Sequence, residues 1–209
     1  MSVPKGSQIR ELGVSGLAII DAVRVEFGSG LTVLTGETGA GKSLTMASFI
    51  RGAIEAYPTT RIVLLTHVKE LIQQDAKAIL RYWPDAPIGI WSAGLGQKTK
   101  HQITVAGIQS VHRLPATFGG TDLVIIDETS MVSAPLLARL VEAVPLSARL
   151  VFIGDPDQLE SVELGAVLGD VVQASESSSS PLAGHSVRLL RGHRFKHDSP
   201  VALLADAVR

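Results

Sequence analysis

The 209-residue sequence lacks several features, and each absence excludes a class of protein. It contains no cysteine, which excludes disulfide frameworks and thiolate metal sites. No apolar run reaches the roughly 18 residues of a membrane span. No charged-then-apolar signal segment begins the chain, so we expect a cytoplasmic protein without membrane contact. Aromatic residues make up only 4% of the chain, which is few for a base-stacking surface.

The net charge of −1 gives no overall basic character of the kind that nucleic-acid-binding proteins show. Charge is nevertheless segregated along the chain. Residues 61–113 carry seven Lys or Arg against three acids, whereas residues 122–170 carry two against nine. Two interpretations remain open: a basic surface beside an acidic metal-binding edge, or exposed helices that merely differ in charge.

The most informative motif is Gly36-Glu-Thr-Gly-Ala-Gly-Lys-Ser43, a complete G-x-x-x-x-G-K-S phosphate loop. Its glycines let successive backbone N–H groups wrap a phosphate, and the N-terminus of the next helix adds partial positive charge. We expect Lys42 to reach the β- and γ-phosphates and the Ser43 hydroxyl to ligate Mg²⁺. The alternative is a chance glycine-rich turn. The expected nucleotide-binding residues are Gly36, Glu37, Thr38, Gly39, Ala40, Gly41, Lys42, Ser43 and Leu44.

A second motif, Leu123-Val-Ile-Ile-Asp127-Glu128, delivers two acids at the end of a buried apolar run. Asp127 at the strand tip would hold Mg²⁺ directly or through water. Glu128 would orient the attacking water as a general base. The alternative is a helix-capping turn, because Thr129 and Ser130 follow.

Apolar strands alternate with helices along most of the chain, which predicts an α/β fold with a mostly parallel sheet covered on both faces. Right-handed crossovers bring the carboxyl ends of the strands to one edge, so Thr35, Thr66, Asp127 and Gly154 should meet there. Expected strands are 31–35, 61–66, 87–91, 102–106, 123–127, 150–154 and 187–190. Expected helices are 42–56, 68–81, 164–173 and 200–208, with one more across Leu136 to Val144.

The sequence also predicts a simple domain organisation. Residues 1–7 are expected to be a disordered tail, and residues 8–209 a single domain. Within it, residues 8–30 should form an antiparallel β-hairpin appendage. The serine-rich stretch favours a mobile loop at 174–184.

The segments Asp127-Glu-Thr-Ser-Met131, Gly154-Asp-Pro-Asp-Gln-Leu159 and His193-Arg-Phe195 resemble the RecD-type helicases of superfamily 1. The quoted motifs place this resemblance over residues 122–209. It implies that Gln158 senses the γ-phosphate or the water and that Arg194 contacts the γ-phosphate. The alternatives are an ordinary Asp-Pro turn and a surface arginine.

Residues 61–113, with Thr66-His-Val-Lys-Glu-Leu71 and Ala106-Gly-Ile-Gln-Ser-Val111, are similar to the DEAD/DEAH-type helicases of superfamily 2. In that family the matching segments touch the nucleic-acid backbone. The alternative is that these side chains cap helices or are merely solvated. The positions that carry over are Thr66, His67, Lys69, Gly107, Gln109 and Ser110.

Residues 8–43 closely resemble the start of RecN, a DNA-repair ATPase of the ABC/SMC kind, although no Leu-Ser-Gly-Gly signature or coiled-coil heptads follow. Three resemblances therefore occur in series, and the phosphate loop is a motif that all three families share. We interpret the chain as a designed, reconstructed or recombined P-loop domain, with an unusual natural helicase relative as the alternative.

Together these features predict a RecA-like P-loop domain that binds ATP or another NTP with Mg²⁺. We expect slow hydrolysis and weak binding of single-stranded nucleic acid, because a helicase motor closes the nucleotide between two such domains. The chain is expected to be a monomer that lacks the second domain. Two alternatives remain: a nucleic-acid-binding module with a vestigial ATPase, and a scaffold that binds nucleotide without selected activity.

Overall fold

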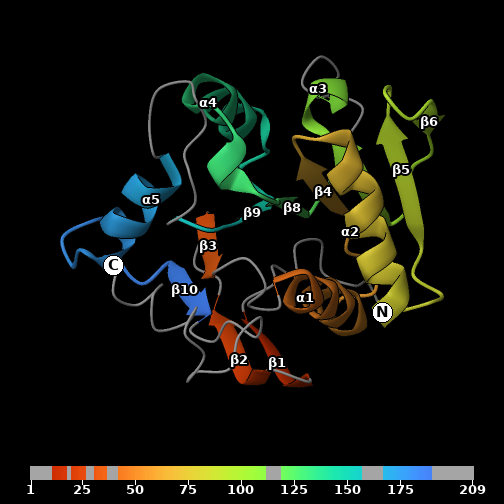
Figure 1. Cartoon of the computed structure of the whole chain (residues 1–209). Helices are drawn as coiled ribbons and strands as arrows, with labels where there is room; N and C mark the ends of the chain where they lie inside the picture. The colour runs from red at the N-terminus through yellow and green to blue at the C-terminus, as the bar shows by residue number, and fades with distance from the viewer. Residues whose placement is uncertain are drawn as a thin grey trace, which may run out of the picture.

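The structure, a computed structural model, describes residues 11–17, 20–26, 31–36, 42–111, 119–156 and 167–189. These residues form an eight-stranded sheet in the order β10-β3-β9-β8-β4-β7-β5-β6, and a separate hairpin pairs β1 with β2 (Figure 1). Neighbouring strands of the large sheet run parallel, except that β5 and β6 are antiparallel. The expected α/β fold with a mostly parallel sheet and an N-terminal antiparallel hairpin is confirmed.

The elements follow the predicted order, with boundaries that differ by a few residues at most where both can be compared. The strands are β1 (Glu11–Leu17), β2 (Ile20–Glu26), β3 (Leu31–Gly36), β4 (Ile62–Thr66), β5 (Ile88–Ser92), β6 (Gln97–Lys98), β7 (Ile103–Gly107), β8 (Leu123–Ile126), β9 (Arg149–Gly154) and β10 (Ser186–Leu189). The helices are α1 (Lys42–Ala56), α2 (Lys69–Tyr82), α3 (Ile108–Val111), α4 (Ala134–Ala143) and α5 (Val167–Glu176), with a 3₁₀ turn η2 (Thr129–Met131). The sequence pattern does not predict β6, α3 or η2, which are all short.

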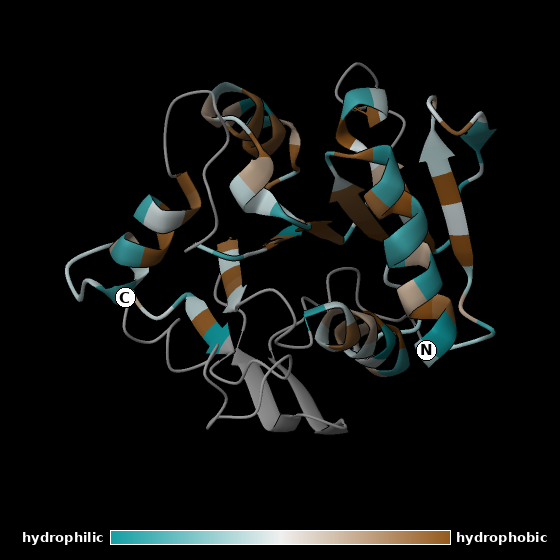
Figure 2. Cartoon of the chain, in the orientation of Figure 1, coloured by the Kyte–Doolittle hydropathy of each residue, from teal (hydrophilic) through white to brown (hydrophobic). Residues whose placement is uncertain are grey.

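Each central strand is buried on both of its faces. In β8, Leu123 and Ile125 pack in a cluster with α1 and α2, whereas Val124 and Ile126 pack with α4 and α5. Figure 2 shows the central strands as almost uniformly hydrophobic, with hydrophilic residues on the outward sides of the helices. Burial on both faces is the reason these strands read as continuous apolar runs.

The strand pairing brings five strand ends together at the carboxyl edge of the sheet. Thr35 of β3 is in register with Gly154 of β9, and Thr66 of β4 is in register with Gly107 of β7. Between these pairs, the Asp127 N–H donates to Leu65 O at 2.9 Å, which extends the contact of β8 with β4 by one residue. The expected meeting of strand ends is therefore present.

Some expectations concern residues that the structure does not describe, namely the tail at 1–7 and the helix at 200–208. The segment 174–184 begins inside α5 and continues through turns toward β10. Within the described part of the chain, no helix has the length and apolarity needed to cross a membrane.

Gly154, the last residue of β9, has no room for a side chain. A Cβ there would lie 2.6 Å from Leu168 Cδ2 of α5 and 3.3 Å from the Thr129 backbone nitrogen. We predict that Gly154→Ala lowers the free energy of unfolding by about 1–3 kcal/mol, because the extra methyl group forces packed neighbours apart. Urea denaturation of the parent and the variant measures this loss.

Gly94→Ala is the matched control for that experiment. A Cβ at Gly94 meets no atom closer than 3.8 Å, so the substitution should be nearly neutral. Equal losses of stability in the two variants would contradict the packing argument.

Candidate active site

The expected phosphate loop connects β3 to α1 at the carboxyl edge of the sheet. Gly36 is the last residue of β3 and Lys42 is the first residue of α1. Glu37, Thr38, Gly39, Ala40 and Gly41 lie outside the described residues. The N-terminus of α1, with its free N–H groups and partial positive charge, is therefore at the edge where the strands end.

Lys42 lies opposite the acidic pair that follows β8. Its Nζ is 3.6 Å from Glu128 Oε1, and the two side chains are only 8% and 18% exposed. Lys42 Nζ and Glu128 Oε2 are both buried without a hydrogen-bond partner among the described residues. Buried charged groups normally have such partners. Two buried polar groups without hydrogen-bond partners fit a site that binds a polar ligand. A phosphate group with a bound cation is such a ligand.

The turn after β8 sets the positions of the two acids. Asp127 is still tied to β4 through its N–H, but Glu128 adopts a left-handed backbone with φ 48° and ψ 47°. The Thr129 hydroxyl donates to Ile126 O at 2.8 Å and closes the turn. Glu128 makes no side-chain capping bond to the 3₁₀ turn that follows, so the structure does not support a helix-capping role. A non-glycine residue at positive φ is uncommon and concentrates at functional sites.

Asp75 of α2 is a third carboxyl group in this site, and sequence reasoning missed it. The side chain is 1% exposed, and its carboxyl group donates a hydrogen bond to the Asp127 carboxylate. The sequence does contain a signal for it. Asp75 lies three residues after Ile72 and four before Ile79, so it falls on the buried face of the amphipathic helix.

Burial controls the protonation of this pair of aspartates. It raises the pKa of Asp75 to about 8, and the negative charges of Asp127 and Glu128 add to the rise. Burial also raises the pKa of Asp127 to about 6, with a further contribution from Glu128. Hydrogen bonds from the Glu128 backbone and Asp75, together with the charge of Lys42, act in the opposite direction on Asp127. Asp75 is therefore neutral near pH 7 and acts as the donor.

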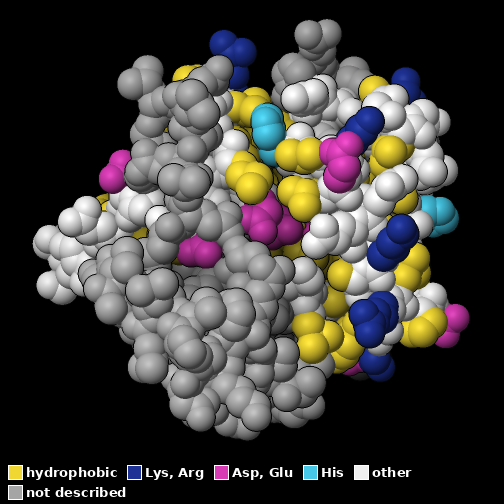
Figure 3. Space-filling view, viewed as in Figure 1, with side chains coloured by type: hydrophobic (Ala, Val, Ile, Leu, Met, Phe, Trp, Pro, Cys, Tyr) yellow, Lys and Arg dark blue, Asp and Glu magenta, His cyan; other side chains and the backbone are white. Residues whose placement is uncertain are grey.

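Figure 3 shows acidic side chains in a recess near the middle of this face, with basic side chains along the side where α2 lies in Figure 1. No three His, Asp or Glu side chains of the described residues are arranged as a metal-binding group. Ser43 and Asp127 carry the oxygen atoms that we expect from the sequence to hold a cation here.

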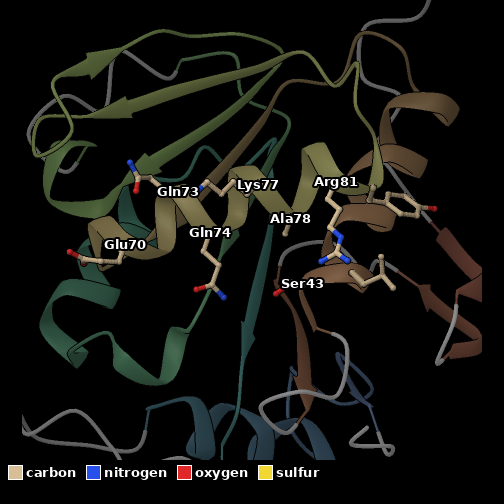
Figure 4. A pocket seen from close by; sticks show the side chains of 9 residues that line it. Ser43, Glu70, Gln73, Gln74, Lys77, Ala78 and Arg81 are labelled. Atoms are coloured by element: carbon tan, nitrogen blue, oxygen red, sulfur yellow. The ribbon is translucent and has the colours of Figure 1, made fainter. Parts of the chain in front are cut away.

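A pocket of about 760 Å³ opens beside Ser43, between α1 and α2. Figure 4 shows Gln74 and Arg81 reaching from α2 toward the side of the pocket where Ser43 lies. Leu44 also lines the pocket. Its volume is within the range of small-molecule sites. The pocket therefore extends along α2 from Ser43, next to the expected position of the phosphates.

The expected nucleic-acid contacts also gather at this edge. Thr66 and Gly107 are register partners at the ends of β4 and β7. His67 and Lys69 lead into α2, and Gln109 is in α3. The structure therefore brings together residues that lie more than 40 positions apart in the chain.

These residues differ in how accessible their side chains are to a bound nucleic acid. Lys69 and Gln109 are exposed, whereas Thr66 is fully buried, so a contact from Thr66 would have to come from its backbone. Ser110 is partly buried, and its Oγ accepts a hydrogen bond from the Ala93 N–H at 3.0 Å. The expected γ-phosphate residues Gln158 and Arg194 lie outside the described residues.

Comparisons with known proteins agree with this geometry. The model of the AAA domain family matches residues 20–209. The RecBCD enzyme subunit RecD of Mycolicibacterium smegmatis is 34% identical over 207 residues, which cover 90% of this chain and 34% of that protein. The DNA repair protein RecN of Bacillus subtilis is 58% identical over 36 residues, which cover 17% of this chain and 6% of RecN.

Among solved structures, the UvsW helicase from Bacteriophage T4 matches with a TM-score of 0.50 over 59% of this chain and 46% of that chain. At 19% identity this likeness shows the fold alone. The chain spans about a third of the length of the RecD proteins that it matches. The similarity to RecD covers 90% of the chain, so the limits of 122–209 taken from the motifs are too narrow. The similarity to RecN on a short segment is confirmed.

The buried aspartates should make the stability of the metal-free protein fall with rising pH. The unfolded chain releases the Asp75 proton above about pH 4, whereas the folded protein keeps it until about pH 8. Because the folded state binds more protons in this interval, alkali favours unfolding. We predict that Asp75→Asn raises the Tm at pH 8 and flattens the decline between pH 4 and pH 8. A gain of ~1 kcal/mol corresponds to roughly 2–4 °C for a domain of this size.

Scanning calorimetry in EDTA at pH 5 and pH 8 measures this effect. The control is Asp85→Asn, which makes the same substitution at an exposed position and should change little. A lower Tm of Asp75→Asn at pH 8 would show that the ionised carboxylate is stabilising and would contradict the prediction.

Proposed function

This chain belongs to the AAA domain family, and we propose that it binds a nucleoside triphosphate with Mg²⁺ at the N-terminus of α1 and hydrolyses it slowly. One observation carries the proposal. Lys42 Nζ lies 3.6 Å from Glu128 in a buried site, and each side chain has a polar atom without a hydrogen-bond partner in the described residues. ATP is the proposed ligand because one relative, 30% identical over 183 residues, is the ATP-dependent RecD2 DNA helicase of Deinococcus radiodurans.

Each residue has a defined role in this proposal. Lys42 binds phosphate oxygens, and the Ser43 hydroxyl and the Asp127 carboxylate would hold Mg²⁺, which prefers oxygen ligands. Bound Mg²⁺ would neutralise phosphate charge. Glu128 orients a water molecule and accepts its proton. Two further roles, for Gln158 and Arg194 at the γ-phosphate, rest on the resemblance to RecD-type helicases.

The pairing of Glu128 with Lys42 in this structure supports the proposal of slow turnover. Its carboxylate is held by Lys42, so it has to exchange that partner before it can orient water. Phosphate binding to Lys42 would release it. An arginine supplied by a second domain can contribute about 10³–10⁵ in rate in related chemistry.

We also propose weak binding of single-stranded nucleic acid at the ends of β4 and β7. The support is that Lys69 and Gln109 are exposed close to the paired strand ends at Thr66 and Gly107. A scaffold that binds nucleotide without activity is the second candidate for the whole chain, favoured by the similarity of its short front segment to RecN in a chain that resembles RecD over 90% of its length. A composite origin by design or recombination remains a prediction.

Phosphate release from ATP tests the enzymatic proposal. We predict that Lys42→Ala abolishes release, because the phosphates lose their buried cation. Glu128→Gln should lower the rate by about 10²–10⁴ while leaving nucleotide binding intact, since only the general base is lost. Binding is measured separately as the rise of Tm with ATP.

Lys98→Ala is the matched control, because Lys98 lies exposed on β6 at the far edge of the sheet. Its rate should equal that of the parent. Equal rates of phosphate release for the parent and Lys42→Ala would contradict the enzymatic proposal. ATP that raises the Tm of a parent without measurable turnover would favour the scaffold.

The nucleic-acid proposal predicts salt-dependent binding of a fluorescent oligo(dT). Lys69→Ala should reduce the slope of log Kd against log[NaCl] by about 0.7–1, because one phosphate contact is lost. Lys77→Ala removes the same charge from an exposed position on the same helix and serves as the control. Equal changes in slope for both variants would mean that the oligonucleotide binds through non-specific electrostatic attraction. Binding at the ends of β4 and β7 would then be contradicted.

A further inference from the structure

Trp91 and Lys100 form a contact that the proposed chemistry does not use. The Lys100 Nζ atom lies 5.6 Å from the centroid of the Trp91 ring. Trp91 belongs to β5 and is partly buried against the core cluster on the α4 side of the sheet, whereas Lys100 is exposed. Attraction between a cation and an aromatic ring is weak where water reaches the cation. The ring therefore faces a side chain that another group can replace.

The hairpin of β5 and β6 holds these two residues in place. The Thr99 N–H donates to Ile90 O at 2.8 Å, and the Ile90 N–H donates to the Thr99 hydroxyl at 3.0 Å. Gly89 allows this close approach, because a Cβ there would lie 2.5 Å from Thr99 O. The residues directly before Trp91 and Lys100 are thus bonded to each other. A site that is fixed in this way loses little conformational entropy when a ligand binds, which favours recognition.

The turn between β5 and β6 joins this hairpin to the proposed nucleic-acid site at the ends of β4 and β7. A Cβ added at Gly94 in the turn would lie 3.8 Å from Lys69 Cδ. The Ala93 N–H donates to Ser110 Oγ at 3.0 Å. Trp91 is three residues before Gly94, at most about 10 Å along an extended chain. Stacked nucleotides of one strand are about 3.4 Å apart, so a strand bound at Lys69 reaches Trp91 within about three nucleotides.

The surroundings of Trp91 favour a polyanion as the partner. Residues 86–111, which include β5, β6, β7 and α3, contain two lysines and no Asp or Glu. Figure 1 shows β5 and β6 near the outer edge of the sheet, where β5 contacts α2 and α3. Single-stranded nucleic acid has both chemistries that fit this place, because its bases stack on aromatic rings and its phosphates bind lysine. A polyanion without planar groups would use the lysines but not the ring.

We propose that Trp91 is a base-stacking position for single-stranded nucleic acid, and that Lys100 contacts a phosphate next to the stacked base. The base would take the place of Lys100 over the indole ring, and the ammonium group would move to the phosphate. The inference rests on the proposed binding of nucleic acid at the ends of β4 and β7. It adds a contact to a base, which tolerates any sequence because every base has an aromatic face.

Tryptophan fluorescence tests the stacking directly, because the chain has two tryptophans. Trp83 follows α2 and packs against the other core cluster. Trp83→Phe leaves Trp91 as the fluorophore, and Trp91→Phe leaves Trp83. A short oligo(dT) is titrated into both proteins at low salt, with oligo(U) of the same length in parallel to distinguish DNA from RNA. We expect quenching in Trp83→Phe and none in Trp91→Phe, with whichever oligonucleotide binds more tightly.

The anisotropy of a dye-labelled oligonucleotide separates stacking from charge. Trp91→Leu keeps an apolar side chain without an aromatic face, so it should raise the Kd about 5–100-fold at an unchanged slope of log Kd against log[NaCl]. Trp91→Phe retains a ring and should recover most of the affinity. Lys100→Gln should instead reduce the slope by about 0.7, because one phosphate contact is lost. Trp83→Leu is the matched control, and it should leave both the Kd and the slope unchanged.

Two outcomes overturn the inference while leaving nucleic-acid binding in place. One is salt-dependent binding by Trp83→Phe without quenching of Trp91. The other is equal affinity of the parent and a folded Trp91→Leu. If Trp91→Leu does not fold, the quenching experiment decides, because it uses the natural residue at position 91. A parent that binds neither oligonucleotide would instead overturn the proposed nucleic-acid binding, and this inference with it.

Discussion

Among the residues that the structure describes, one buried ammonium group shares its site with three carboxyl groups, and the arrangement of the site depends on this imbalance of charge. Lys42 pairs with Glu128. Asp127 directly precedes Glu128 in the chain, and Asp75 contacts Asp127 from α2. Three full negative charges beside one positive charge would be strongly unfavourable in a buried place. Retention of the Asp75 proton reduces the excess, and a bound cation would reduce it further.

The sheet explains why these groups meet. Strands β3, β9, β8 and β4 are neighbours and run parallel, so their carboxyl ends lie side by side. In a parallel sheet buried on both faces, most strand residues are apolar, and charged groups concentrate at the strand ends. Gly154 lets the turn after β8 approach β9 closely, with its Cβ position only 3.3 Å from the Thr129 nitrogen. The same packing that excludes water from the core therefore determines where the acids lie.

Local patterns predicted much of this structure, because the chemistry of each element is contained within a few residues. Helix α1 has the expected bounds of Lys42–Ala56, since the phosphate-loop motif specifies where a helix begins. Strand β8 was evident from its four consecutive apolar residues. Asp75 was missed because its partner, Asp127, is 52 positions away in the sequence and only the packing of α2 on the sheet brings them together. The burial of Thr66 likewise depends on its neighbours in β7 and β8 rather than on its own segment.

Helix α2 connects the two regions that the sequence suggested separately. It begins at Lys69, beside the strand ends expected to meet nucleic acid, and it carries Asp75 about 9 Å further along its axis at 1.5 Å per residue. A rigid helix that contributes residues to both regions cannot shift at one without moving at the other. Burying an acid at position 75 is energetically unfavourable. A position beside a functional site accounts for it, because such sites commonly retain locally unfavourable groups that the rest of the fold stabilises.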